Sequence, residues 1–520
     1  MSLFKTAFTT HPTLLRTVPI LFFAGLLSAL AFAPFFCFPI LIITLSFLMW
    51  VINHAQKAKR AALFGFSFGA GLGISSLGWV CNALMIDNGS LAIFIPICLI
   101  GLALFLGFFW MLSAWVAFYA PSGIKRWIAF ACSVVFFEWV RSWFLTGFPW
   151  NLIGSVWTDN LYFLQFASVW GVYGLTFVTV LIFTATGLLP NKKPLVFALI
   201  LVSVITAGGW LRLYQATPED VFGVHLRIVQ PNIQQTLKWN PQKAEDNLNT
   251  LIRLSKTKNE EITHVIWPES AIPYLLENNP TERLRLMSAI RQGGTLITGA
   301  LRIVSREKRQ LANSIFMIDH LANIVGYADK AHLVPFGEYI PFRNILPLDK
   351  VVPIQSDFVA GKKVKTIMVP KAVPAALLVC YEIIFSGRVT DKNNRPQWII
   401  NVTNDGWYGI SPGPFQHLGM AQLRAVEEGL PVVRAANTGI SALISPYGEI
   451  LSYKALNTQG VIDTKLPRAT EPTIYSQFGY KPFIVFVVLI YLIMIWHSLI
   501  NIGKRRTNHK KENTKNQKST

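Results

Sequence analysis

A cysteine, a glutamate and a lysine in the C-terminal half of the chain are the residues best suited to chemistry. Cys380 closes the apolar run in "LLVCYEII", Glu269 ends "VIWPES", and Lys330 lies in "YADKAHLVPFGEYIP". A thiol needs a base to become a nucleophile, and a nearby cation stabilises both the thiolate and the oxyanion formed when it attacks a carbonyl. Together the three residue types predict nucleophilic attack by Cys380 on a carbonyl group.

Each of the three also has a purely structural interpretation. Free cysteine often packs as a small buried apolar group, Glu269 could be a solvated turn residue, and Lys330 beside Asp329 could be an exposed charge pair. The catalytic interpretation is favoured because all three follow predicted strands, next to proline or glycine. There a rigid sheet positions a side chain while a loop leaves it accessible.

The composition indicates a membrane protein. Hydrophobic residues make up 52% and charged residues 14% of the chain, and the mean hydropathy is +0.42. A transmembrane helix needs about 20 apolar residues. Runs of that kind occur at 17–35, 36–54, 62–85, 91–120, 127–146, 161–189, 195–213 and 482–501.

The net charge of +20 is distributed as expected for membrane topology and not for binding nucleic acid. Lysine and arginine cluster in every second loop between the apolar runs, while "APFFCFP", "MIDNGS" and "TGFPWNLIGSVWTDN" contain none. The positive-inside rule then places both termini in the cytoplasm. The segment 214–481 is predicted on the opposite side, which is the periplasm of a bacterium.

Four regions are expected: a membrane bundle of about seven helices at 1–213, a periplasmic domain at 214–481, a C-terminal transmembrane helix at 482–501 and a basic cytoplasmic tail at 502–520. The second region alternates short β-branched runs such as "HLRIVQ", "TLITGAL" and "PQWIINVTN" with helical stretches such as "FQHLGMAQLRAVEEG". This alternation predicts an α/β domain.

Other features of the sequence carry less weight. The remaining cysteines show no paired spacing, and His332 and His417 have no partners at metal-ligand spacing, so neither a disulfide framework nor a metal site is predicted. "GAGLG" at 69–73 favours close helix packing over nucleotide binding. Glu138 and Arg141 favour a structural ion pair, the alternative being a lipid pathway.

The order "WPES", "DKAHLVPFGEY" and "CYE", followed by "NVTNDGWYG" and "RAANTG", resembles the nitrilase superfamily of carbon-nitrogen hydrolases. With spans before and after this domain, and "TGFPWNL" in an outward loop, nearly the whole chain resembles the bacterial apolipoprotein N-acyltransferase family. The resemblance implies a multi-span α-helical bundle joined to an extracytoplasmic α-β-β-α sandwich. It also implies an enzyme of the bacterial inner membrane.

The resemblance further implies that Cys380 takes an acyl chain from a phospholipid, such as the sn-1 chain of phosphatidylethanolamine, as a thioester. The acceptor would be the N-terminal α-amine of a diacylglyceryl-cysteine apolipoprotein, and no cofactor is needed. Glu269 would be the general base and Lys330 the oxyanion stabiliser. The residues carried over in supporting roles are Glu338, Tyr381, Glu382 and Asn313, with Trp239 as a lipid contact.

Two other functions remain open from the sequence: a membrane-anchored nitrilase-type amidase, and a lipid-handling scaffold without catalysis. A full bundle of spans argues against the amidase, and the complete trio argues against the scaffold. The loop 341–361 could be a lid that enters the bilayer or a plain connector. Because flanking spans restrict packing between domains, the chain is expected to be a monomer.

Overall fold

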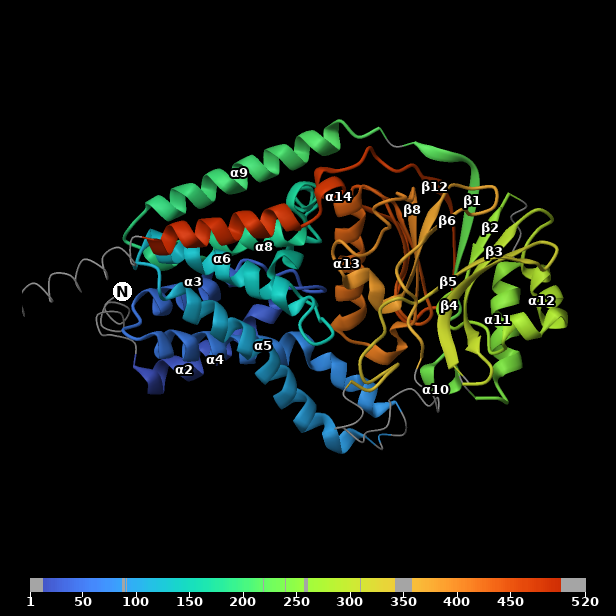
Figure 1. Cartoon of the computed structure of the whole chain (residues 1–520), viewed down its shortest axis with the longest axis horizontal. Helices are drawn as coiled ribbons and strands as arrows, with labels where there is room; N and C mark the ends of the chain where they lie inside the picture. The colour runs from blue at the N-terminus through green and yellow to red at the C-terminus, as the bar shows by residue number, and fades with distance from the viewer. Residues whose placement is uncertain are drawn as a thin grey trace, which may run out of the picture.

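The computed structural model describes residues 13–86, 89, 91–217, 219–238, 240–256, 261–308, 310–341 and 358–496. A bundle of helices precedes an α/β domain, and a last apolar helix, Lys481–Trp496, returns to the bundle (Figure 1). Its Tyr491 hydroxyl donates a hydrogen bond to the carbonyl of Val116 at 3.0 Å. The expected fold class, a helical membrane bundle joined to an α/β domain, is confirmed.

The helices of the bundle follow the predicted apolar runs. They are α2 (Leu14–Ser28), α3 (Ile40–Asn53), α4 (Ala58–Leu77), α5 (Ile95–Ala117), α6 (Ile124–Arg141), α8 (Ala167–Thr184) and α9 (Lys193–Tyr214). Within the described residues, 5 helical stretches are long and apolar enough to cross a membrane: Leu14–Ala31, Ala58–Met85, Ala92–Ala117, Ala167–Leu188 and Lys193–Tyr214. Helix α3 and Lys481–Trp496 are apolar but shorter, and α6 is interrupted by charged residues.

The glycine run at 69–73 brings three helices together, as predicted. A Cβ atom on Gly71 would lie 2.0 Å from the Phe22 carbonyl oxygen of α2, and one on Gly73 would lie 2.6 Å from the Leu102 carbonyl oxygen of α5. Backbones can approach this closely only where a side chain is missing. The run is therefore a packing motif of α4.

The α/β domain contains two six-stranded sheets. The first has the order β12-β1-β2-β3-β4-β5 and the second β11-β10-β9-β8-β7-β6. The strands of the first sheet are β1 (Asp220–Gln230), β2 (His264–Ile266), β3 (Thr295–Ser305), β4 (Gln310–Asp319), β5 (Ile324–Asp329) and β12 (Gly460–Pro467). Those of the second are β6 (Thr366–Ile367), β7 (Ala375–Val379), β8 (Trp398–Thr403), β9 (Val432–Ala436), β10 (Ser441–Ile444) and β11 (Ile450–Lys454).

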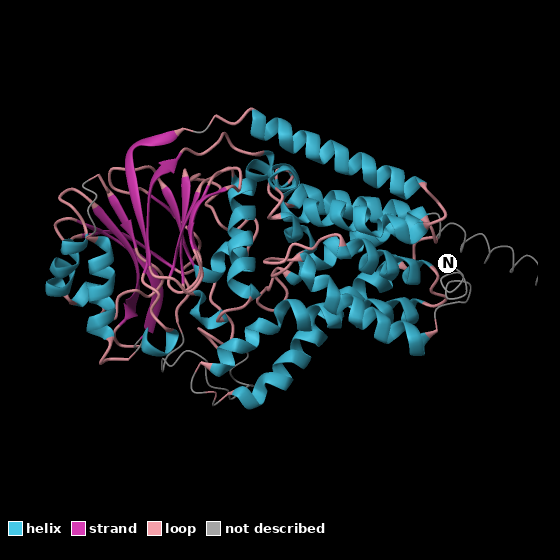
Figure 2. Ribbon diagram, turned by 180° about the vertical axis from the view of Figure 1, so that it is seen from behind, coloured by secondary structure: helices cyan, strands magenta, loops and turns pink. Residues whose placement is uncertain are grey.

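The two sheets face each other and share one apolar core, in which Ile228 and Ile266 of the first sheet meet Leu377 and Val402 of the second. Helices α11 (Ala244–Ser255) and α12 (Pro280–Leu286) cover the outer face of the first sheet (Figure 2). Helix α13 (Pro412–Glu428) covers the second sheet, which buries β7, β8 and β9 on both faces and explains their continuous apolar sequence. The layers are those of the expected α-β-β-α sandwich.

Helix α13 lies between the sheets and the membrane bundle (Figure 1). The indole N–H groups of Trp79 and Trp150, both in the bundle half, donate to the Gln416 side-chain oxygen of α13 at 3.0 and 2.9 Å. The layer that supports the second sheet is therefore also its attachment to the membrane half.

Candidate active site

The predicted catalytic residues lie at the ends of three strands. Glu269 comes three residues after β2, Lys330 directly follows β5, and Cys380 directly follows β7 and begins the 3₁₀ turn η8 (Cys380–Ile384). The first sheet thus supplies the carboxylate and the cation, and the second supplies the thiol. Lys330 lies 3.7 Å from Glu269, and the N–H of the next residue, Ala331, donates to Glu382 two residues after Cys380 at 2.7 Å, so the structure brings the trio together. The charges of Glu269 and Lys330 both act on the pKa of Cys380.

The position of Glu269 depends on Gly299 in the neighbouring strand β3. A Cβ atom on Gly299 would lie 2.5 Å from the backbone nitrogen of Ser270 and 2.6 Å from the Cα of Glu269. The same crossing is held by a hydrogen bond from the Ala271 N–H to the Gly299 carbonyl at 2.9 Å. Glycine lets the chain turn here and direct Glu269 toward the second sheet.

Glu269, Lys330, Glu338 and Asn313 form one buried cluster. The Lys330 ammonium donates to Glu338 Oε1 at 3.0 Å and lies 3.7 Å from Glu269 Oε1. The Asn313 side-chain nitrogen donates to Glu269 Oε1 at 2.8 Å and to Glu338 Oε1 at 3.0 Å. Asn313 therefore fixes the two carboxylates relative to each other.

Lys330 is held in its charged form. Burial alone would lower the pKa of this ammonium, but Glu338 and then Glu269 outweigh that effect, so its pKa lies above the usual range. A permanent cation beside a thiol is suited to stabilise an oxyanion.

Cys380 has a left-handed backbone conformation, with φ of +53°, and its side chain is buried. A non-glycine residue rarely adopts this conformation, which here turns the chain sharply out of β7. Burial, and next the negative charge of Glu269, raise the pKa of the Cys380 thiol to about 12, while Lys330 acts in the opposite direction. The resting thiol is therefore protonated at neutral pH and needs a base when it attacks.

Glu382 joins the strand end of Cys380 to the segment after Lys330. One carboxylate oxygen accepts from the Val379 N–H at 2.7 Å, and the other accepts from the N–H groups of Ala331 at 2.7 Å and His332 at 3.1 Å. Burial raises the pKa of this carboxyl to about 7, in spite of these three bonds. Its contacts are those of a positioning residue.

Tyr381 joins the site to the bundle half. Its hydroxyl donates to the Gly147 carbonyl at 2.9 Å, in the "TGFPWNL" loop. Behind that loop Arg141 donates to the Trp150 carbonyl at 2.8 Å and lies 3.9 Å from Glu138, whose carboxylate accepts from the Ile153 N–H at 2.9 Å. The predicted ion pair of α6 therefore forms, and it holds the loop on which Tyr381 rests.

A buried network behind Cys380 was not anticipated from the sequence. The carbonyl of Cys380 lies 3.3 Å from His417 Nε2, and His417 Nδ1 lies 2.9 Å from Asp405. Arg434 donates to Asp405 at 2.7 Å. Burial disfavours the charge of Asp405, but Arg434 and His417 outweigh it and lower the pKa to about 2. The two histidine ring contacts could not be read from spacing, because they join α13 to the turn after β8 and to η8.

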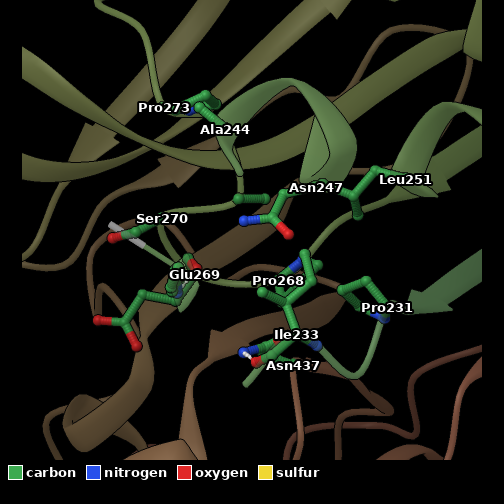
Figure 3. A pocket seen from close by; sticks show the side chains of 12 residues that line it. Pro231, Ile233, Ala244, Asn247, Leu251, Pro268, Glu269, Ser270, Pro273 and Asn437 are labelled. Atoms are coloured by element: carbon green, nitrogen blue, oxygen red, sulfur yellow. Dashed lines mark hydrogen bonds between the residues drawn. The ribbon is translucent and has the colours of Figure 1, made fainter. Parts of the chain in front are cut away.

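A pocket opens beside Glu269. Figure 3 shows Ile233 and Asn437 on one side of it and Asn247 of α11 on the other, with Pro268 between them. The buried Lys238, at the end of the short helix α10 (Gln235–Lys238), also lines it and was likewise not anticipated.

Of the remaining predicted residues, Trp239 lies outside the described part of the chain, as do residues 342–357 of the predicted lid at 341–361. Their expected contacts with lipid remain predictions. All other predicted site residues gather around the ends of β2, β4, β5 and β7 and in the segments that follow them.

Comparison with known proteins matches two separate regions of the chain to two families. Residues 24–185 match the apolipoprotein N-acyltransferase N-terminal domain, and residues 225–474 match the carbon-nitrogen hydrolase family. An apolipoprotein N-acyltransferase of Rhodopseudomonas palustris is 36% identical over 501 residues, covering 91% of this chain and 93% of that protein. One from Bradyrhizobium diazoefficiens is 37% identical with the same coverage.

Among solved structures, a mutant of a Nesterenkonia amidase from the nitrilase superfamily aligns with a TM-score of 0.38 and 16% identity, covering 50% of this chain and 95% of that one. The two matched regions correspond to the helical bundle and to the sandwich that carries Cys380. The identity to the curated relatives extends across both. The chain belongs to the apolipoprotein N-acyltransferase family and is a membrane acyltransferase with a carbon-nitrogen hydrolase domain.

Proposed function

We propose that the protein transfers an acyl chain from a phospholipid, such as the sn-1 chain of phosphatidylethanolamine, to the α-amine of diacylglyceryl-cysteine at the N-terminus of apolipoproteins. The observation that carries this proposal is the position of the trio at the junction with the bundle. Tyr381, next to Cys380, is hydrogen-bonded to the Gly147 carbonyl of an interhelical loop. A site at that position meets lipid esters at headgroup level without extracting them from the membrane.

In the first half-reaction Glu269 removes the Cys380 proton as the sulfur attacks the ester carbonyl. The Lys330 ammonium stabilises the oxyanion of the tetrahedral intermediate. The ester C–O bond breaks, Glu269 returns the proton to the departing glycerol oxygen, and lysophospholipid leaves. Cys380 then holds the acyl chain as a thioester.

In the second half-reaction the acceptor's neutral α-amine attacks the thioester. Glu269 takes a proton from the nitrogen as the C–N bond forms, the C–S bond breaks, and the proton returns to the sulfur. The protein would lie in the inner membrane, with the sandwich on the periplasmic side and both termini in the cytoplasm. It would act as a monomer. These assignments follow from the basic loops and from the spans on either side of the domain.

The test uses purified full-length protein, phosphatidylethanolamine labelled in the sn-1 chain, and a diacylglyceryl-cysteine peptide. The expected product is a peptide that carries the label in an amide. Release of labelled free fatty acid alone would identify an anchored hydrolase instead. Full transfer by the Cys380→Ala variant would rule out the thioester mechanism and favour the lipid-handling scaffold.

A further inference from the structure

Two lysines lie near the Cys380 thiol, and only one of them is paired with carboxylates. Lys330 contacts both Glu338 and Glu269. Lys238 is 9% exposed, and within the described residues its ammonium makes one hydrogen bond, to the backbone carbonyl of Glu269 at 2.8 Å. No described carboxylate lies within ion-pair distance of it. A buried cation without an anion is unfavourable, so this arrangement calls for an anionic partner.

The ammonium of Lys238 is bonded to the backbone of the residue whose side chain is the proposed base, Glu269. Its charge interacts with both Glu269 and Cys380, and burial, partly opposed by these two groups, lowers its pKa to about 8. Two of its three N–H donors have no partner in the described part of the chain. These two donors are available to an anion that enters the neighbouring space.

The pocket beside Glu269 provides that space. Lys238 is one of the residues that line it. Figure 3 shows three further polar residues of its lining, Ser270, Asn247 and Asn437. The Ser270 hydroxyl makes no side-chain hydrogen bond to another described residue, while the Asn247 and Asn437 amides are both engaged with backbone carbonyls. The donors left over are thus one ammonium and one hydroxyl, a combination that suits phosphate oxygens.

We propose that Lys238, with Ser270, binds the phosphodiester of the donor phospholipid and so places its sn-1 ester at Cys380. This inference rests on the proposed function and names the part of the donor that the site recognises. The phosphodiester is joined to the sn-1 ester through the glycerol backbone, so a single cation beside the nucleophile can fix both. A donor without a phosphate gains nothing from Lys238.

The experiment compares two donors with wild-type protein and with Lys238→Met. Phosphatidylethanolamine carries the phosphate, and p-nitrophenyl palmitate is an acyl ester without one. Acylation is followed as release of lysophospholipid or of p-nitrophenol. Loss of a hydrogen bond to a charged group predicts a fall of about tenfold to a hundredfold with phosphatidylethanolamine. With p-nitrophenyl palmitate the fall is expected to be at least about tenfold smaller, because that donor has no phosphate to lose, and the activity that remains shows that the variant folds.

Lys238→Arg is expected to recover most of the preference for the phospholipid, because the cation is kept. Lys243, an exposed lysine paired with Asp246 at 3.1 Å, supplies the matched control, and Lys243→Met is expected to leave both rates unchanged. Inorganic phosphate is then added to the p-nitrophenyl reaction of the wild type. The proposal expects no inhibition.

Equal losses with the two donors would overturn the proposal and give Lys238 a role in the chemistry common to both esters. Inhibition by inorganic phosphate in the wild type, absent in Lys238→Met, would assign the site to free phosphate and would also overturn it. If wild-type protein releases product from neither donor, the proposed function itself fails. Equal losses with the two donors, in contrast, would contradict only the role of Lys238 and would leave the proposed function standing.

Discussion

Both halves of the molecule bury a glutamate beside a cationic side chain, Glu138 with Arg141 in the bundle and Glu269 with Lys330 in the sandwich, and the two glutamates are bonded differently. In the bundle the Glu138 oxygens accept from the Ile153 N–H and the Thr176 hydroxyl, and Arg141 donates to two backbone carbonyls. In the sandwich Glu269 accepts one hydrogen bond from Asn313, on Oε1. Its Oε2 has no hydrogen-bond partner among the described residues. A carboxylate oxygen that is left free to take a proton, and not burial or pairing as such, distinguishes the proposed general base from the structural carboxylate.

The largest effect on acyl transfer is expected when Glu269 loses its charge. We expect Glu269→Gln to reduce acyl transfer by about 10²–10⁴-fold, the usual contribution of a general base. The same change is expected to lower the pKa of the Cys380 thiol, because the Glu269 charge raises it. The measurement is the pH dependence of iodoacetamide alkylation at Cys380, beside the transfer rate.

Lys330→Met is expected to shift the pKa of the Cys380 thiol in the opposite direction and serves as the control for that measurement. Removing a cation that lowers the thiol pKa is expected to shift the alkylation profile to higher pH. If Glu269→Gln raised the thiol pKa, or transferred acyl chains at the normal rate, the assignment of Glu269 as base would be wrong.

In the bundle, loss of one partner is expected to reduce stability and not to change the chemistry. Arg141→Met leaves Glu138 buried without its cation, which typically costs about 3–5 kcal/mol. Unfolding in detergent should therefore begin at a lower temperature than in the wild type. The pH profile of Cys380 alkylation should stay that of the wild type, and a shifted profile would contradict the division between the two pairs.

His417 tests whether the backbone of Cys380 must be held in place for the chemistry, because its ring contacts the Cys380 carbonyl. His417→Leu removes the closer of the two side-chain donors to that buried carbonyl and leaves the Asn401 amide at 3.4 Å, and such a loss costs about 1–3 kcal/mol. We expect thioester formation to slow by about tenfold to a hundredfold, with partial recovery in His417→Gln. Stopped-flow acylation by a p-nitrophenyl ester measures it.

His264 provides a matched control. It is also buried, and its Nε2 lies 2.8 Å from the Pro370 carbonyl, at the far end of β2 from Glu269. His264→Leu is expected to lower stability without slowing acylation. Equal slowing by both substitutions would mean that His417 acts only through packing.

The smallest effect is expected at the junction between the halves. Tyr381→Phe removes one hydrogen bond, to Gly147, and keeps the ring contacts with Phe148 and Phe385. One neutral hydrogen bond contributes about 1 kcal/mol. Transfer should fall less than about tenfold with phosphatidylethanolamine in vesicles, and a complete loss would show that Tyr381 contacts the reacting atoms.

Much of the fold could be predicted because its signals are local. The apolar runs became the helices of the bundle, and "AALLVCYE" and "PQWIINVTN" became β7 and β8, buried on both faces. The two-residue strand β6 and the strands β10 to β12 were not identified. The outer ones, β11 (ILSYK) and β12 (GVIDTKLP), are short, mix apolar with polar residues without regular alternation, and are largely half-buried or exposed, so no local pattern tells them from loops.

The candidate site was predicted where residue type alone suggests chemistry, as for Cys380, Glu269 and Lys330. Lys238 was missed because it lies among polar residues in "NIQQTLKWNP", a stretch typical of an exposed turn. Its burial comes from packing against the segment of Glu269, 31 positions away in the chain. Asp405 and His417 were missed for the same reason, since their pairing depends on how α13 docks on the second sheet.

The most direct test is to mix purified protein with phosphatidylethanolamine, without an acceptor, and to analyse the peptide that contains Cys380 by mass spectrometry. We predict an acyl adduct on Cys380 that hydroxylamine removes, that appears together with lysophospholipid, and that is missing in Cys380→Ala. Folded protein that later transfers acyl chains to a peptide but never carries this adduct would contradict the thioester mechanism.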